Sequence, residues 1–268
     1  MNLLIRILSS SGAIGLIGCV LWQLPKAFFS IGTSVFCGIA MFEILTMLKG
    51  KGVQVYRLFG VAMGAMLPLV VHLQYGISHS GEVLFIVLSC FCLFLIQFSR
   101  KNNPNAIEGI ALTFFAIMYV AWFLSFIVKL NFLANGALWI TYLLVVTKAC
   151  DVAAFGFGSV FGKTSLIPHI SPNKSVEGTM AGVICSALVS ALFQCILPVH
   201  IGVLHLLSLG LVIGLVAQCG DLSESLIKRY CGVKDSSEII PGFGGLLDVI
   251  DSALFTIPLF YYYLETWH

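Results

Sequence analysis

Charged residues are scarce in this sequence. It carries 14 Lys and Arg and 12 Asp and Glu among 268 residues, or 10%, whereas soluble domains carry about 25%. Hydrophobic residues make up 59% of the chain, and the mean hydropathy is +1.02. A chain this apolar cannot cover a globular surface with polar groups, which excludes a soluble enzyme and a disordered protein alike. The net charge of +2 is too small to indicate nucleic-acid binding.

Several familiar motifs are also missing. The nine Cys are an odd number, lie mostly within apolar runs and form no Cys-x-x-Cys pair, so they indicate packing residues and neither disulfides nor a zinc site. Gly162, Lys163 and Thr164 follow Gly158 at a spacing one residue too short for a P-loop. No internal repeat is evident, which disfavours a transporter built from inverted halves.

What the sequence does contain is a regular series of apolar runs, each long enough to cross a bilayer, which takes about 17–25 residues. Because a chain in lipid must satisfy its own backbone hydrogen bonds, and the runs lack strict alternation, they predict helices. The sequence therefore predicts an all-α, polytopic integral membrane protein with about nine transmembrane helices. The predicted spans are 3–24, 27–48, 58–77, 81–99, 105–128, 132–149, 177–197, 200–218 and 249–265.

The basic residues predict the orientation. In this arrangement 12 of the 14 Lys and Arg lie on one face, which the positive-inside rule makes cytoplasmic. Two long polar segments, about 150–176 and 219–248, fall on that face. Residues 1–130 then form a scaffold of transmembrane helices and residues 131–268 a catalytic region. We expect the site at the cytoplasmic ends of the C-terminal helices, in an inner or plasma membrane.

The acidic residues support this division. Eight of the twelve fall between 151 and 251, whereas Glu43, Glu82 and Glu108 stand alone among apolar neighbours in the first half. The first half therefore has the pattern of a scaffold, and the second half that of a site.

The first polar segment contains phosphate-compatible groups. Lys163, Lys174 and Ser175 are donors placed shortly before a predicted helix, where free backbone amides also favour anions. Gly156, Gly158 and Gly162 allow a ligand to approach the backbone closely. The alternative is a glycine-rich seam between helices with lysines that reach toward the membrane surface.

The second polar segment contains carboxylates near membrane depth. Asp221 ends an apolar run, and Asp248 and Asp251 begin the next at a spacing that places both on one helix face. Carboxylate oxygens suit Mg²⁺, which bridges to substrate phosphates, and nearby cations would bind the same anion. The alternative is a set of ion pairs and helix caps. The cations are Lys228, Arg229 and Lys234.

These residues resemble the signature of the phosphatidate cytidylyltransferases, or CDP-diacylglycerol synthases. The matching positions in the second segment are Ser225, Lys228, Arg229, Lys234, Asp235, Pro241, Gly242, Gly244, Gly245, Asp248 and Asp251. In the first segment they are Ile170, Ser171, Pro172, Lys174, Ser175, Glu177 and Gly178. Two positions depart from the family pattern: Phe243 replaces a His and Val249 replaces an Arg. His169 is a candidate to substitute for the lost His, a hypothesis that fails if His169→Ala keeps full turnover.

The resemblance implies transfer of the cytidylyl group of CTP to phosphatidate, with Mg²⁺, a second cation such as K⁺, and a homodimer. The implied metal ligands are Asp221, Asp248 and Asp251. The implied catalytic residues are Asp221, Asp248, Lys228 and Arg229. The implied substrate-binding residues are Lys163, Ser171, Lys174, Ser175, Lys234, Gly244 and Gly245. A related membrane CTP-dependent enzyme that acts on a polyprenol or an isoprenoid glycerol lipid is the alternative, and a transporter is a weaker one.

Overall fold

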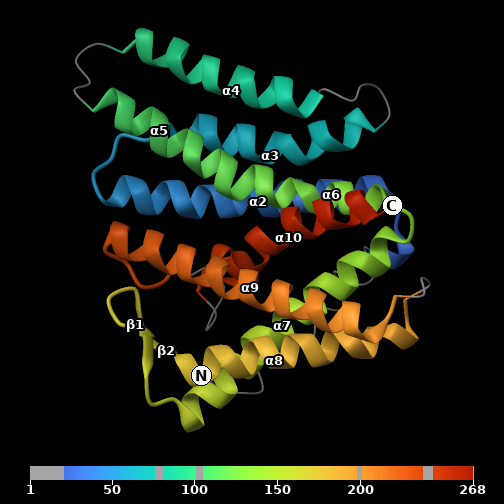
Figure 1. The fold of residues 1–268 in the computed structure, drawn as a ribbon. Coiled ribbons are helices and arrows are strands. Elements are labelled where there is room, and N and C mark those ends of the chain that lie inside the picture. Colours follow the sequence, from blue (N-terminus) through green and yellow to red (C-terminus); the bar gives the residue numbers. More distant parts are fainter. Residues whose placement is uncertain (1–20, 76–80, 101–104, 198–200, 238–243, 268) are drawn as a thin grey trace. The chain divides into compact units, whose positions relative to one another are not determined.

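The computed structural model describes residues 21–75, 81–100, 105–197, 201–237 and 244–267 (Figure 1). In these residues eight helical segments are long and apolar enough to cross a membrane. This confirms the predicted all-α polytopic membrane protein. Each of the eight matches one of the predicted spans, while the predicted span 3–24 lies mostly outside the described residues.

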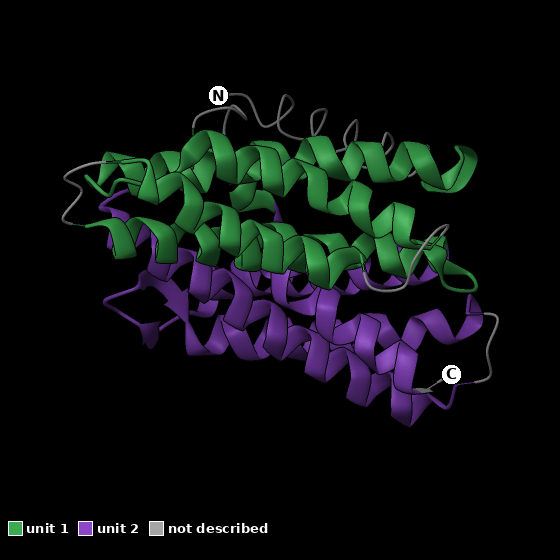
Figure 2. Ribbon diagram, turned by 90° about the horizontal axis from the view of Figure 1, so that it is seen from above, with its two compact units in different colours: residues 1–137, 235–249 green, residues 138–234, 250–268 purple. Residues whose placement is uncertain are grey.

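The helices of the first half form one compact unit, residues 1–137 with 235–249 (green in Figure 2). A single predicted span, 105–128, consists of an α-helix, a π-helical stretch (Ile117–Trp122) and a second α-helix. The helices are α2 (Lys26–Gly50), α3 (Arg57–Gln74), α4 (Gly81–Phe98), α5 (Ala106–Ala116) and α6 (Phe123–Phe132).

The second compact unit comprises residues 138–234 and 250–268 (purple in Figure 2). Its helices are α7 (Gly136–Phe161), α8 (Val176–Leu192), α9 (Val203–Cys231) and α10 (Leu247–Trp267), and a short 3₁₀ turn (Phe193–Cys195) follows α8. An antiparallel hairpin of β1 (Ser165–Ile167) and β2 (Ser171–Ser175) precedes α8. The first two residues of α7 and the first three of α10 belong to the other unit.

The polar segments differ from the expected loops. The segment predicted at 150–176 begins with twelve residues of α7, and the one predicted at 219–248 begins with thirteen residues of α9. Both helices continue past the end of the apolar run because backbone hydrogen bonding does not stop where hydrophobicity does. The functional division at 130/131 stays a prediction.

Small residues hold α9 against α8 in the second unit. Gly210 and Gly214 lie one turn apart on α9, and a Cβ on Gly210 would lie 2.7 Å from the Cα of Ala187. Ser186 Oγ and Ser190 Oγ donate to the carbonyl oxygens of Gly210 and Leu206 at 2.9 and 2.6 Å. Close backbone approach with such hydrogen bonds is how helices associate in lipid, where water gives no driving force.

A glycine ends α9. Gly232 has a φ of +74°, its N–H donates to the carbonyl of Arg229, and the N–H of Val233 donates to that of Lys228. This Schellman arrangement satisfies the last carbonyls and stops the helix. The polar C-terminal part of α9 is thereby fixed as helix up to Cys231, which positions the residues of the candidate site.

Candidate active site

Carboxylates and lysines of the second unit meet where α7, α9 and α10 carry their polar ends. Asp151 comes from α7, Asp221 from α9 and Asp251 from α10. Gly220, the neighbour of Asp221, lies against the backbone of Asp251, and Ser252, the neighbour of Asp251, donates to Asp151. Lys148 and Lys174 lie among these carboxylates. The set forms the carboxylate–lysine cluster: Lys148, Asp151, Lys174, Asp221, Asp251.

Asp151 is held on one side only. Its Oδ2 accepts from Lys148 Nζ at 3.0 Å and from Ser252 Oγ at 2.8 Å. Its Oδ1 is buried and has no hydrogen-bond partner, an arrangement that costs free energy unless a donor or a cation binds there. Ser252 is fully buried, so one edge of the Asp151 carboxylate is fixed by hydrogen bonds, whereas the buried Oδ1 of the other edge has none.

Asp221 forms an ion pair with Lys174, the residue just before the N-cap of α8. Lys174 Nζ lies 2.5 Å from Asp221 Oδ2 and 3.5 Å from Gln218 Oε1. Gln218 in turn donates to Cys150 Sγ at 3.4 Å, which ties α9 to α7. Lys174 was predicted to bind a substrate phosphate, and it lies against a predicted metal ligand.

Asp251 is the most buried of the three carboxylates, with 9% of its surface exposed. Its Oδ1 accepts from the backbone N–H of Ser252 at 2.5 Å. A Cβ on Gly220 would lie 2.6 Å from the carbonyl oxygen of Asp251. Only glycine permits this approach of α9 to α10, and the next residue along α9 is Asp221. The close crossing therefore brings the two carboxylates together.

The donor set fits a divalent cation. Among the described residues no three His, Cys, Asp or Glu side chains stand as a ready-made metal centre, and lysines neutralise Asp151 and Asp221. However, the oxygens are all hard ligands, and the buried Oδ1 of Asp151 lacks a partner. A Mg²⁺ ion that keeps several waters needs only one or two protein carboxylates together with substrate phosphates.

The basic residues of α9 make protein contacts. Lys228 Nζ lies 2.8 Å from Glu224 Oε2, and Glu224 is fully buried. Arg229 Nε donates to the carbonyl oxygen of Ile170 at 3.1 Å, and its Nη1 donates to that of Val233 at 3.3 Å. In this structure Arg229 holds the β1–β2 turn against α9. Their catalytic roles stay predictions.

The first polar segment forms a cap and a seam. Ser175 is the N-cap of α8 and accepts from the N–H of Gly178 at 3.1 Å. Glu177 accepts from the backbone N–H groups of Lys163 and Thr164 at 3.2 Å. A Cβ on Gly162 would lie 2.7 Å from Ser175 Oγ. The glycine-rich seam raised as the alternative is therefore present, while the Lys163 side chain is exposed.

Asp248 has a separate environment within the first unit. Its Oδ2 accepts from Gly245 N at 2.7 Å, from Ser236 Oγ at 2.8 Å and from Ser236 N at 3.0 Å. The bond from Gly245 caps the start of α10, which begins at Leu247. Asp248 thus fixes the loop before its own helix, and a metal role would require its other oxygen or displacement of these donors.

The remaining predicted residues lie in or near this loop. Gly244 has a φ of +88°, a conformation that favours glycine, and Gly245 is buried. Lys234 is exposed, and Ser171 lies at the start of β2. Phe243, like Pro241 and Gly242, lies outside the described residues. Val249 is in the first turn of α10.

Four residues of the two polar networks are not among the predicted site residues. Lys148 and Asp151 are three apart on a helix, a spacing that places them on one face and was visible in the sequence. Ser252 follows a predicted ligand directly. No sequence signal indicates Glu43, whose carboxylate accepts from the backbone N–H groups of Leu246 and Leu247.

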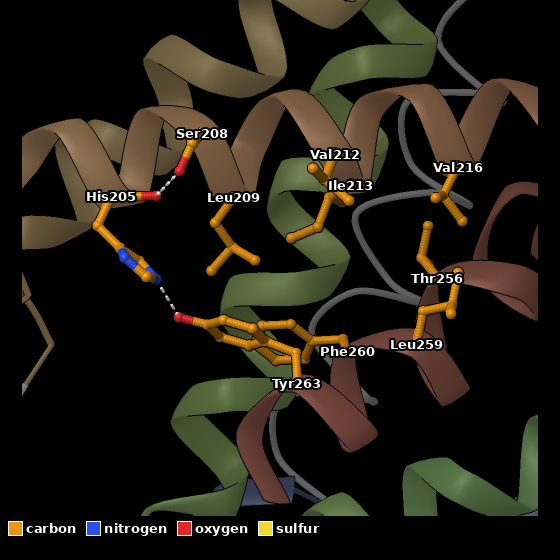
Figure 3. A pocket seen from close by; sticks show the side chains of 10 residues that line it. All are labelled: His205, Ser208, Leu209, Val212, Ile213, Val216, Thr256, Leu259, Phe260 and Tyr263. Carbon is orange, nitrogen blue, oxygen red and sulfur yellow. Dashed lines mark hydrogen bonds between the residues drawn. The ribbon is translucent and has the colours of Figure 1, made fainter. Parts of the chain in front are cut away.

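An apolar cavity of about 220 Å³ lies along α9 and α10 in the second unit, as Figure 3 shows. At one end His205 Nε2 and Tyr263 OH form a hydrogen bond of 2.5 Å. No Asp, Glu, Lys or Arg lines it, and none of its lining residues belongs to the carboxylate–lysine cluster. Its lining residues are His205, Ser208, Leu209, Val212, Ile213, Val216, Thr256, Leu259, Phe260 and Tyr263.

Comparison with known proteins assigns the chain to one family of enzymes. A model of the cytidylyltransferase family matches residues 4–267. The phosphatidate cytidylyltransferase of Bacillus subtilis (strain 168) is 34% identical over 231 residues, 84% of this chain and 84% of that protein. That of Staphylococcus epidermidis (strain RP62A) is 39% identical over 175 residues, 65% of this chain and 64% of that protein. An uncharacterized protein of Escherichia coli (strain K12), YnbB, is 40% identical over 157 residues, 59% of this chain and 52% of that protein.

Proposed function

The chain belongs to the cytidylyltransferase family, and we propose that it transfers the cytidylyl group of CTP to phosphatidate, giving CDP-diacylglycerol and pyrophosphate. The observation that carries the proposal is the carboxylate–lysine cluster, in which three carboxylates and two lysines from α7, α9, α10 and β2 converge in an apolar protein. Ionisable groups at membrane depth are costly and mark functional sites.

The reaction requires no covalent intermediate with the protein. A phosphate oxygen of phosphatidate attacks the α-phosphorus of CTP, the bond between that phosphorus and the bridging oxygen breaks, and pyrophosphate leaves with the electron pair. The phosphate monoester is already largely ionised near neutral pH, so no strong base is required. Positioning and neutralisation of charge supply the catalysis.

The lysines of the cluster suit this task. In the structure Lys174 and Lys148 neutralise Asp221 and Asp151, and Lys148 is also 3.4 Å from Ser252 Oγ. Side chains already placed among the carboxylates can turn to a phosphate when it binds, because the ammonium group is a flexible point charge. Lys148 is 45% exposed, which leaves room for that movement.

Asp151, Asp221 and Asp251 of the second unit would hold Mg²⁺, and the metal role implied for Asp248 of the first unit stays a prediction. The ion would neutralise the phosphate oxygens of CTP and the charge that develops on the leaving pyrophosphate. The unpartnered Oδ1 of Asp151 supports its inclusion. A second cation such as K⁺ belongs to the same proposal.

The protein is an integral membrane protein, with eight apolar helices in its described residues. We place the site at the cytoplasmic face of the inner or plasma membrane, because 12 of the 14 basic residues fall on one predicted face. CTP is supplied from that side, while the acyl chains of phosphatidate remain in the bilayer. A homodimer is part of the proposal and can be measured by light scattering in detergent.

The test is an assay with purified protein in detergent, labelled CTP, Mg²⁺ and either phosphatidate, a polyprenol or an isoprenoid glycerol phosphate. We expect CDP-diacylglycerol and pyrophosphate from phosphatidate, and none after chelation by EDTA. Asp251→Asn should lower the rate about 10²–10³-fold, the usual effect of removing a key electrostatic group. Glu265→Gln, an exposed carboxylate near the other end of α10, is the matched control. If the folded protein does not react with phosphatidate but modifies a polyprenol, the alternative, a CTP-dependent enzyme acting on a polyprenol, would replace the proposal.

A further inference from the structure

Glu43 is a buried carboxylate that the proposed chemistry does not use. It lies within α2, is 1% exposed, and its hydrogen bonds come from a segment nearly 200 residues later. Oε1 accepts from Ser237 Oγ at 2.5 Å and from Leu246 N at 2.9 Å, and Oε2 accepts from Leu247 N at 2.7 Å. These donors flank the Gly244–Gly245 turn of the signature.

The Glu43 carboxylate meets the N-terminus of α10. Leu246 and Leu247 supply backbone N–H groups at the start of that helix, where no carbonyl of the helix can accept them. A carboxylate is stabilised there by the direct hydrogen bonds and by the partial positive charge of the helix end. Glu43 therefore does from another helix what an N-cap residue does from within its own.

The same network reaches Asp248 through one serine. Ser236 Oγ donates to Asp248 Oδ2 at 2.8 Å and lies 3.4 Å from Glu43 Oε2. A Cβ on Gly245 would lie 2.7 Å from both Glu43 oxygens, so the turn packs directly on the carboxylate. The position of Glu43 thus determines where the turn, Ser236 and Asp248 lie relative to α2.

We propose that Glu43 is a positioning residue that fixes Ser236, Ser237 and residues 244–248, so that Asp248 and the Gly244–Gly245 turn are in place for Mg²⁺ and CTP. The proposal rests on the proposed function, because that function gives Asp248 its role. An uncharged side chain of the same shape cannot replace Glu43: in Gln, one oxygen becomes an NH₂ group that faces two donors.

The first test is Glu43→Gln, measured by hydrogen exchange at the amides of residues 245–248 and by the Mg²⁺ concentration that gives half-maximal activity. We expect faster exchange at Leu246 and Leu247 and a Mg²⁺ requirement raised about 10–100-fold, the range seen when residues that orient metal ligands are changed. Thr33→Val is the control, because Thr33 is a buried polar residue of α2 that bonds to the carbonyl of Phe29. It should leave both quantities unchanged.

A second pair of variants distinguishes a positioning role of Glu43 from a purely structural one. These variants also provide the test if Glu43→Gln does not fold. Ser236→Ala and Ser237→Ala each remove one hydroxyl donor to Glu43, and Ser236→Ala also removes a bond to Asp248. We expect the larger rise in the Mg²⁺ requirement from Ser236→Ala. Equal effects of the two, or a Glu43→Gln protein that melts earlier with an unchanged Mg²⁺ requirement, would reduce Glu43 to a structural cap.

Failure of the proposed function can be distinguished from failure of the positioning role of Glu43. If the wild-type protein makes no CDP-diacylglycerol, that function fails, and the thermal shift given by Mg²⁺ and CTP replaces activity as the measure of binding. Loss of that shift in Glu43→Gln, with faster exchange at Leu246 and Leu247, would still support positioning. An unchanged shift and unchanged exchange would overturn it.

Discussion

The Glu82–Lys129 group of the first unit and the carboxylate–lysine cluster of the second unit differ in how completely their atoms are paired. In the first unit Glu82 lies 2.6 Å from Lys129 Nζ, and it also accepts from Trp122 Nε1 at 2.5 Å and from Gln74 Nε2 at 3.5 Å. Glu82 and Lys129 are 6% and 8% exposed. In the second unit Asp151 has one buried oxygen without a partner, and its Lys148 is half exposed.

The difference separates a structural group from a reactive one. A buried ion pair whose remaining lone pairs accept hydrogen bonds offers nothing to a ligand, and its loss is felt as instability. A carboxylate with one oxygen that lacks a donor, beside a lysine that can move, can bind a cation through that oxygen and offers a positive charge to an anionic substrate. We therefore expect changes at the Glu82 group to lower stability and changes at the carboxylate–lysine cluster to lower the rate.

The largest expected effect is on stability, in Glu82→Gln. Loss of the carboxylate leaves the Lys129 charge buried without that counter-charge, which typically costs about 3–5 kcal/mol. Thermal unfolding in detergent should show a large fall in Tm, with the rate per folded molecule unchanged. The double variant Glu82→Gln, Lys129→Met removes both charges and should recover most of the loss. A fall in rate at full stability would mean that the first unit also holds reacting groups.

Asp221→Asn is the converse experiment. It removes the negative charge beside Lys174 without changing side-chain size, and we expect the rate to fall about 10²–10³-fold while Tm changes little. Both side chains reach solvent, Asp221 with 28% and Lys174 with 18% of its surface exposed, which limits the contribution of the pair to stability. If Asp221→Asn instead destabilises the protein and the rate per folded molecule is unchanged, the cluster is structural. The proposed difference between the two groups would then be wrong.

Much of the fold could be predicted from the sequence because it follows from local hydrophobicity. A run of apolar residues must form a helix in lipid, and each of the eight helical segments falls on a predicted run. What could not be predicted was where helices end beyond those runs, as at Phe161 and Cys231. The hairpin of β1 and β2 was also missed, because Ser165–Ser175 is short and polar and shows no alternation.

The contacts within the candidate site could be anticipated only in part, and the roles of its residues stay predictions. Asp221, Asp251 and Lys174 lie in motifs, and the structure brings them together through the close approach at Gly220. Glu43 and Glu82 stand among apolar residues in the sequence. Apart from Gln74, which lies eight residues before Glu82, their partners lie 40 or more residues away, so the sequence gives no hint of them. Asp248 shows the same limit: its spacing to Asp251 predicts one helix face, but not the capping of Gly245.

A smaller effect is expected from Ser252→Ala, which refines the comparison within the cluster. Ser252 Oγ donates to Asp151 Oδ2 at 2.8 Å, and a hydrogen bond to a charged group contributes about 1.5–3 kcal/mol. Because Asp151 Oδ2 then keeps only Lys148 as a donor and the carboxylate is less firmly oriented, we expect the rate to fall about tenfold or more, with a raised Mg²⁺ requirement. Ser208→Ala, on the exposed face of α9, is the control. Full activity at normal Mg²⁺ would remove Asp151 from the proposed metal ligands.

The smallest effect is expected from Tyr263→Phe, which breaks a polar pair of the second unit outside the cluster. Tyr263 OH and His205 Nε2 lie 2.5 Å apart at one end of the apolar cavity. Hydrogen bonds between helices in membranes contribute about 0.6 kcal/mol on average, so Tm should fall slightly and the rate should stay the same. The pair contains no carboxylate, and its loss leaves the lysines and the unpartnered Asp151 oxygen unaffected. A tenfold loss of rate would show that completeness of pairing does not by itself separate structural from reactive groups, since a neutral pair distant from the cluster along α9 and α10 would then also control the reaction.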